Sequence, residues 1–165
     1  MTLTSLNINF QFKTGCDNQN NIICSRTGSG KTIVASIICK YWATIAKRKN
    51  KKYFGAFLVP TRYLAVQQSK SFENCFNPND LEHSIENMNE IKVKKCFETS
   101  KILFLTPQKL INLLDQKLVK ICDFNILIFD EAHHTNDDHP YNVIMSRYFN
   151  EKQQDHQKVP LIIGK

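Results

Sequence analysis

Short apolar runs alternate with helical patterns along this chain, and this alternation limits the possible folds more than any other feature of the sequence. Each run ends at a loop signal, and a strand followed by a helix is typical of a parallel sheet. The unit repeats about five times, so we expect an α/β fold with helices on both faces of the sheet. The expected strands are residues 21–25, 56–60, 102–106, 126–130 and 159–164.

Three helices can be located from apolar residues at helical spacing. In the second of them, Thr106 and Pro107 form an N-cap and first-turn pair, and the third opens at Pro140. Residues 77–99 are polar and contain no glycine, so we expect at most one modest helix there. The apolar positions are Val34, Ile37, Ile38, Tyr41 and Ile45 in the first helix, Leu110, Leu113, Leu114 and Leu118 in the second, and Tyr141, Ile144, Met145, Tyr148 and Phe149 in the third.

Composition favours a single domain. A chain of 165 residues that is 42% hydrophobic can bury one core, which we place at residues 21–165 after a segment of uncertain structure at 1–20. The net charge of +7 suits a polyanionic partner, but such a charge is also common in proteins that never bind nucleic acid. Residues 47–52 carry five basic side chains, and we expect a solvated helix end rather than a binding site.

The cysteines and the apolar runs of the sequence indicate in which cellular compartment the protein is expected to work. No C-x-x-C pair is present, so we expect free thiols in a reducing compartment. No apolar run approaches the roughly 18 to 20 residues that cross a bilayer, and the N-terminus lacks the features of a signal peptide. We therefore expect a soluble cytoplasmic protein that does not bind membranes. The cysteines are Cys16, Cys24, Cys39, Cys75, Cys96 and Cys122.

A glycine-rich segment joins the first strand to the first helix, which is the context that a phosphate-binding loop requires. Glycines let backbone N–H groups point at phosphate oxygens, and the helix adds its positive N-terminal end. Lys31 would reach the β- and γ-phosphates, and the Thr32 hydroxyl would hold Mg²⁺. A simple turn is the alternative, although G-x-G-K-[S/T] arises by chance in well under about 1% of such chains. The expected nucleotide-binding residues are Ser25, Arg26, Thr27, Gly28, Ser29, Gly30, Lys31 and Thr32.

Two adjacent carboxylates follow the strand at 126–130, about one hundred residues after Lys31. The carboxyl ends of parallel strands line one crevice, so Asp130 can face the phosphate-binding loop. Asp130 would bind Mg²⁺, directly or through a water molecule, and Glu131 would orient and deprotonate the attacking water. The alternative is that both residues only cap the next helix. The presence of a phosphate-binding loop favours the nucleotide site.

Together these residues resemble superfamily 2 DExD/H-box helicases. Residues 57–68, F-L-V-P-T-R-Y-L-A-V-Q-Q, look like motif Ia, and L-T-P-Q-K-L at 105–110 resembles the T-P-Q-x-L motif. The resemblance implies a RecA-like first lobe that uses ATP and Mg²⁺. It also implies that two loops hold the backbone of a nucleic-acid strand, a role suited to hydroxyl, amide and guanidinium groups at strand ends. The implied contacts are Thr61, Arg62, Thr106 and Gln108, each of which could instead be ordinary capping.

The segment from 130 to 148, D-E-A-H-H-T followed by H-P-Y-N-V-I-M, is similar to RIG-I-like RNA sensors and, more loosely, to Dicer. This resemblance implies double-stranded RNA as the partner and innate immunity as a setting. It also implies that His133 relays between the nucleotide and the rest of the motor, beside the catalytic residues Lys31, Asp130 and Glu131. His133, His134 and His139 could suggest zinc, but no matching cysteine or carboxylate set accompanies them.

The chain departs from the family pattern in several places. Ala132 stands where these families usually have cysteine, and Phe10-Gln11 is a weak substitute for the motif that selects adenine. No glycine lies between residues 56 and 163, where the family has a glycine-containing backbone-contact loop. The final P-L-I-I-G-K stands where the family continues into T-A-S. We therefore interpret the chain as one lobe, truncated before motif III.

Several functions remain open at this point. The leading hypothesis is the ATP-binding lobe of an RNA helicase or RNA-activated ATPase, and the second is a DNA translocase of the same superfamily. A third is nucleotide or RNA binding without turnover, because the arginine finger and half of the RNA channel would come from a second lobe. A P-loop kinase is disfavoured, since the sequence has no recognisable acceptor site or lid.

Overall fold

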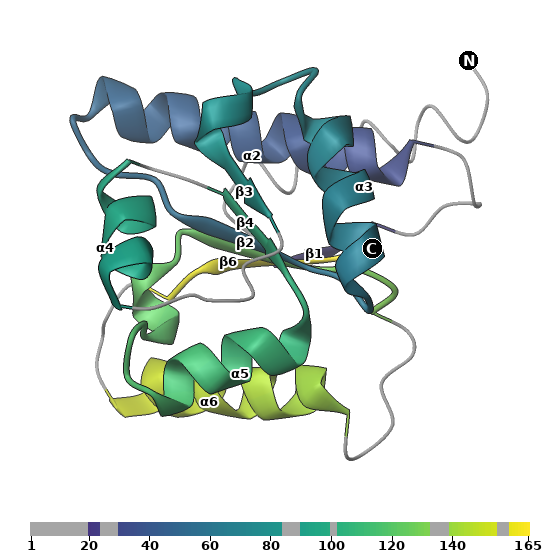
Figure 1. The fold of residues 1–165 in the computed structure, drawn as a ribbon. Helices are drawn as coiled ribbons and strands as arrows, with labels where there is room; N and C mark the ends of the chain where they lie inside the picture. Colours follow the sequence, from purple (N-terminus) through teal and green to yellow (C-terminus); the bar gives the residue numbers. More distant parts are fainter. Residues whose placement is uncertain (1–19, 24–29, 84–89, 100–101, 133–138, 155–158) are drawn as a thin grey trace.

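A six-stranded parallel sheet forms the centre of the molecule in the computed structural model (Figure 1). The structure describes residues 20–23, 30–83, 90–99, 102–132, 139–154 and 159–165. The strand order is β1-β6-β5-β2-β4-β3, and every neighbouring pair is parallel. The strands are β1 (Asn21–Ile22), β2 (Gly55–Leu58), β3 (Leu81–His83), β4 (Ile102–Leu105), β5 (Ile126–Phe129) and β6 (Leu161–Gly164).

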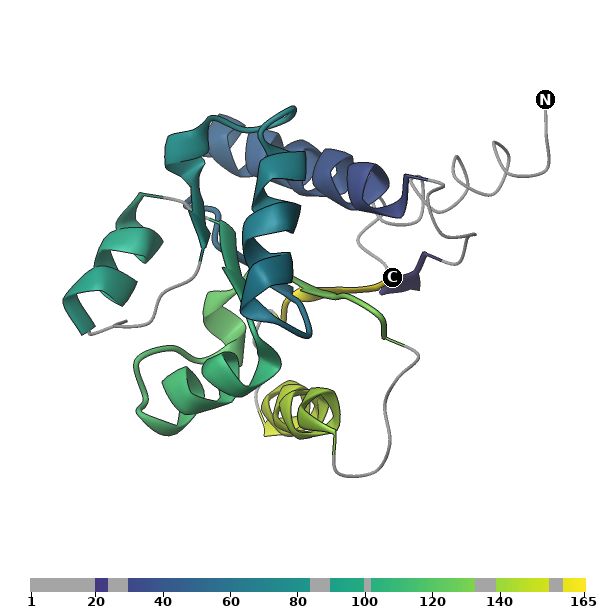
Figure 2. The ribbon, with the colours of Figure 1, turned by 45° about the vertical axis from the view of Figure 1, so that its right-hand side comes forward.

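Helices cover both faces of this sheet, as the sequence predicts. Helices α2 and α3 lie together on one face, and α5 and α6 lie together on the other (Figures 1 and 2). Side chains of α4 pack into the same apolar cluster as those of α5 and α6. The helices are α2 (Lys31–Arg48), α3 (Arg62–Phe72), α4 (Glu90–Glu98), α5 (Pro107–Asp115) and α6 (Pro140–Gln154), with short 3₁₀ helices at Pro78–Asp80 and Ile121–Asp123.

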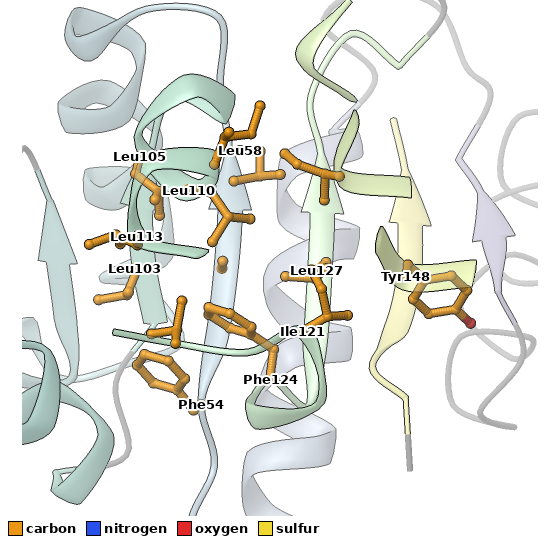
Figure 3. Packing of buried hydrophobic residues seen from close by; sticks show 14 of the residues in the cluster. Phe54, Leu58, Leu103, Leu105, Leu110, Leu113, Ile121, Phe124, Leu127 and Tyr148 are labelled. Carbon is orange, nitrogen blue, oxygen red and sulfur yellow. The ribbon is translucent and has the colours of Figure 1, made fainter. Parts of the chain in front are cut away.

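The central strands β2, β4 and β5 are buried on both faces, which explains why their sequences are continuously apolar. Successive side chains of a strand point to opposite faces. Thus Phe57 packs toward α2 and α3, whereas its neighbour Leu58 packs toward α5 and α6. Figure 3 shows Leu58 beside Leu103, Leu105 and Leu110 in the apolar cluster on the α5 and α6 side of the sheet. Two apolar layers therefore hold the sheet in place.

Two sequence expectations need correction. The strand β3 was not predicted, because it has only three residues and carries Glu82 and His83; it joins the sheet through parallel pairing with β4. At most one modest helix was expected at 77–99, and α4 is the α-helix there, together with a 3₁₀ turn at Pro78–Asp80. Leu118 was expected in a helix, but α5 ends at Asp115 and the chain turns at Lys117, whose φ is 56°.

The described residues include four of the six cysteines and all of the helices that could be tested as membrane spans. Cys39, Cys75, Cys96 and Cys122 are free thiols there, and burial raises the pKa of Cys39 to about 12. Cys16 and Cys24 lie outside the described residues. Within the described part of the chain, none of the helices has the length and hydrophobicity needed to cross a membrane.

Candidate active site

The parallel register brings the ends of several strands to one edge of the sheet. Leu58 of β2 is aligned with Leu105 on one side and with Phe129 on the other, and Phe129 is aligned with Gly164. The residues that follow these positions therefore leave the sheet side by side. They include Thr106, Asp130 and Lys165.

The start of α2 supplies the other side of this edge. Gly30 precedes the helix with φ 87°, in the left-handed region that glycine adopts without steric cost. Lys31 and Thr32 are the first two helical residues, where backbone N–H groups lack partners within the helix and the helix dipole is positive. No acidic residue lies in the first turn to neutralise this end. Ser25, Arg26, Thr27, Gly28 and Ser29 lie outside the described residues.

The two acidic residues are adjacent in sequence but occupy different environments. Asp130 is 6% exposed, and its backbone N–H donates to the Leu58 carbonyl at 2.9 Å. Glu131 is exposed and has a φ of 52°, a left-handed conformation that costs a residue with a Cβ roughly 1–2 kcal/mol. The chain turns sharply between them. Asp130 is thereby held against the sheet, and Glu131 follows it as an exposed residue.

The side chain of Tyr141, in the first turn of α6, contacts the backbone at the turn that contains Asp130 and Glu131. Its buried hydroxyl lies 2.7 Å from the Asp130 carbonyl oxygen and 3.1 Å from that of Leu58, so its proton is shared between two strand ends. Burial raises the pKa of Tyr141, and the charges of Asp130 and Glu131 raise it further. The hydroxyl is therefore a stable donor. The sequence located Tyr141 only as part of an apolar helix face.

One cationic group contacts both residues that were expected to bind Mg²⁺. The Nζ atom of Lys165 lies 2.7 Å from Thr32 Oγ1 and 3.2 Å from Asp130 Oδ1. A single cation can thus reach both oxygens. A hydroxyl and a carboxylate are hard oxygen ligands of the kind that Mg²⁺ prefers, so these residues fit that ion.

Lys165 itself was missed by sequence reasoning, which assigned it no role. Burial lowers the pKa of its ammonium below the ordinary value for lysine, although the neighbouring Asp130 opposes this shift. Its only sequence signal is its position, directly after a buried strand at the carboxyl edge of the sheet. Such a position places a side chain beside whatever follows the neighbouring strand.

The expected nucleic-acid contacts divide into two pairs. Thr106 and Gln108 line a pocket of about 300 Å³ together with Asp130 and Glu131. Gln108 also donates to Asn112 at 3.0 Å. Although Thr106 is the N-cap of α5, as expected, its side chain makes no capping hydrogen bond. The Thr106 hydroxyl therefore does not cap this helix.

The second pair lies at the start of α3. Thr61 caps this helix by accepting a hydrogen bond from the Leu64 N–H at 3.3 Å, and Arg62 is exposed. The capping alternative thus applies to Thr61. Neither residue lines the pocket around the acidic pair, although the preceding Pro60 does. The expected relay His133 and its neighbour His134 lie outside the described residues.

Comparisons with known proteins identify the family of this chain. Residues 11–161 match the family model described as DEAD/DEAH box helicase. The chain is 31% identical to Endoribonuclease Dicer homolog 1 of Arabidopsis thaliana and 34% identical to Antiviral innate immune response receptor RIG-I of Sus scrofa, with 88% of the chain covered in each case. It spans only 8% and 16%, respectively, of the lengths of these relatives.

A solved structure is also similar. The crystal structure of the Pyrococcus furiosus Hef helicase domain matches 95% of this chain with a TM-score of 0.75 and 30% sequence identity. The chain covers 31% of that structure. The similarity therefore extends over almost the whole chain, and the chain corresponds to one part of the larger domain.

Proposed function

The chain belongs to the DEAD/DEAH box helicase family, and from this premise we propose that it is the ATP-binding lobe of an RNA helicase or RNA-activated ATPase of RIG-I-like or Dicer type. In this proposal, ATP hydrolysis is coupled to the binding or remodelling of double-stranded RNA. The names of two relatives, a Dicer homologue and the receptor RIG-I, support this choice. The observation that carries it is the convergence of Thr32 and Asp130 on one cationic group.

Each residue at the edge has a distinct part in the proposed chemistry. Lys31, at the positive end of α2, binds the β- and γ-phosphates, and Thr32 and Asp130 hold Mg²⁺. When bound, Mg²⁺ neutralises charge on the phosphates. The exposed carboxylate of Glu131 orients the attacking water and accepts its proton. His133 completes the set as the relay that the family resemblance implies.

The RNA-binding part of the proposal rests on the pocket beside the acidic pair. Thr106 and Gln108 share this pocket with Asp130 and Glu131. A group bound there would therefore contact both the proposed nucleic-acid contacts and the proposed catalytic carboxylates. Thr61 and Arg62 lie at the start of α3, directly after Pro60, which lines this pocket. We further propose that a second helicase lobe supplies the arginine finger, that residues 21–165 form the ATP-binding domain, and that the protein works in the cytoplasm.

Nucleotide titration tests the ATP-binding part directly. A fluorescent ATP analogue would be titrated into the chain in Mg²⁺ and in EDTA, with Thr32→Ala, Asp130→Asn and the control Thr44→Ala. Thr44 lies on the same helix, and its hydroxyl donates to the Lys40 carbonyl away from the site. We expect EDTA and both site variants to remove the Mg²⁺-dependent part of the affinity, while the control behaves as wild type. Affinity that is indifferent to EDTA and to both site variants would contradict the proposal.

A further inference from the structure

Lys165 is fixed in the site from its backbone to its ammonium group. Its N–H donates to the Phe129 carbonyl at 2.9 Å, and its carbonyl accepts from the Ala132 N–H at 3.0 Å. Both bonds tie it to residues that flank the acidic pair. The side chain is 4% exposed, and its Nζ lies 5.0 Å from the centre of the Phe57 ring, within the range of a cation–π contact.

We propose that the ammonium of Lys165 is the resident cation of the Thr32–Asp130 pair, and that a divalent cation must displace it to bind there. The inference rests on the proposed assignment of these two residues as the Mg²⁺ site. The ammonium uses the oxygens that the metal needs, Thr32 Oγ1 at 2.7 Å and Asp130 Oδ1 at 3.2 Å. Two cations cannot share these positions, because like charges repel strongly at such distances.

The burial of Asp130 explains why a resident cation is useful. A carboxylate that is 8% exposed is costly to bury without an opposite charge, and removal of one partner of a buried pair is strongly destabilising. Lys165 supplies this positive charge when no metal is bound. The folding of this edge of the sheet therefore does not require Mg²⁺. One hydrogen bond to Thr32 and a ring contact with Phe57 also hold the ammonium in place.

The same arrangement lowers the affinity of the site for metal. A divalent cation must first separate a buried ion pair and move the ammonium away from Phe57. Its apparent affinity falls by the fraction of molecules in which the site is accessible. The lysine stem is flexible, so the ammonium can move aside while the backbone remains paired with Phe129 and Ala132. If the divalent cation bound away from the Thr32–Asp130 pair, replacement of the lysine would leave metal affinity almost unchanged.

Direct binding of Mn²⁺, a paramagnetic substitute for Mg²⁺, distinguishes these roles. Free Mn²⁺ would be measured by electron paramagnetic resonance for the nucleotide-free chain, Lys165→Met, Lys165→Gln and the control Lys70→Met. Lys70 is an exposed residue at the end of α3. We expect both Lys165 variants to bind Mn²⁺ at least about tenfold more tightly than wild type, and the control to match wild type. Equal affinity in wild type and both Lys165 variants would overturn the inference.

Asp130→Asn, alone and combined with Lys165→Gln, separates this inference from the proposed site. We expect the gain from Lys165→Gln to disappear in the double variant. If Asp130→Asn weakens Mn²⁺ binding while the Lys165 variants show no gain, the metal site stands and the displacement inference fails. If Mn²⁺ binding does not depend on Asp130 at all, both fail.

Thermal unfolding supplies a second readout of the same exchange. In metal-free buffer, Lys165→Met should unfold several degrees below wild type, because Asp130 loses its partner. Mn²⁺ should restore most of this loss and should change the wild-type Tm much less. A methionine variant that folds only when Mn²⁺ is present also supports the inference. A variant that Mn²⁺ neither stabilises nor refolds contradicts it, because the divalent cation would then not replace the ammonium.

Discussion

The side-chain ammonium of Lys165 lies 3.2 Å from the carboxylate of Asp130, and both side chains are almost completely buried. The two residues follow neighbouring parallel strands, β6 and β5, whose last aligned residues are Gly164 and Phe129. The pairing of these strands, rather than a local motif, therefore creates the contact. Whether the negative charge of Asp130 is neutralised therefore depends on which residue follows the neighbouring strand.

Tyr141→Phe should destabilise the chain by about 1–2 kcal/mol, because the hydroxyl that serves the Asp130 and Leu58 carbonyl groups is lost in a buried setting. Urea denaturation followed by circular dichroism measures this change. Tyr41→Phe, at a position that is 41% exposed on α2, is the matched control and should be close to neutral. Equal stability of Tyr141→Phe and wild type would show that the hydroxyl does not secure the two strand ends.

Glu131→Gln should preserve nucleotide binding and abolish hydrolysis in a protein that joins this lobe to a second helicase lobe. The substitution keeps the shape of the side chain and removes the base, a loss of about 10²–10⁴ in rate for general base catalysis. Steady-state ATPase assays and titration with an ATP analogue measure the two effects separately. Turnover equal to that of wild type would leave Glu131 with a structural role alone.

The chain by itself should bind RNA weakly, with little sequence preference and a shallow dependence on salt. Thr61, Arg62, Thr106 and Gln108 are expected to form only half of a backbone-tracking surface, so few phosphates would be neutralised at once. Fluorescence anisotropy from low to physiological salt, with double-stranded RNA and DNA of matched sequence, measures this. ATPase activity should be slow and change little with RNA, because the second lobe's arginine is not supplied.

Nanomolar RNA affinity or strong RNA-stimulated turnover by these 165 residues would contradict the interpretation that the chain is one lobe and needs a second lobe for activity. Tighter binding to DNA than to RNA would instead favour the DNA translocase alternative. The two outcomes are separable, since one concerns the strength of binding and the other its preference.

The extent to which sequence predicts this fold depends on burial. Strands β2, β4 and β5 are covered on both faces, so their apolar runs are unbroken and were located correctly. The edge strand β3 is short and partly polar, and its place is fixed by backbone pairing with β4, which leaves little trace in the side chains. Strand order also depends on pairing between distant segments, which periodicity does not encode.

The same distinction applies to the candidate site. Local motifs predicted Lys31, Thr32 and Asp130 as site residues, because a glycine turn before a helix and acidic residues after a strand have recognisable patterns. Lys165 and the Tyr141 hydroxyl act through contacts between distant segments, and a single lysine or tyrosine has no such pattern. Structure was therefore needed to find the residues that neutralise the acidic edge and hold its backbone.

ATP binding is the central claim, and titration of Lys31→Ala with a fluorescent ATP analogue in Mg²⁺ tests it most directly. Lys31 lies in the first turn of α2, where its charge would face the β- and γ-phosphates. Lys47→Ala, in the last turn of the same helix, is the matched control. The account predicts that Lys31→Ala loses most of the affinity while remaining folded and that Lys47→Ala retains it. Unchanged affinity in a folded Lys31→Ala protein would contradict the phosphate-binding assignment.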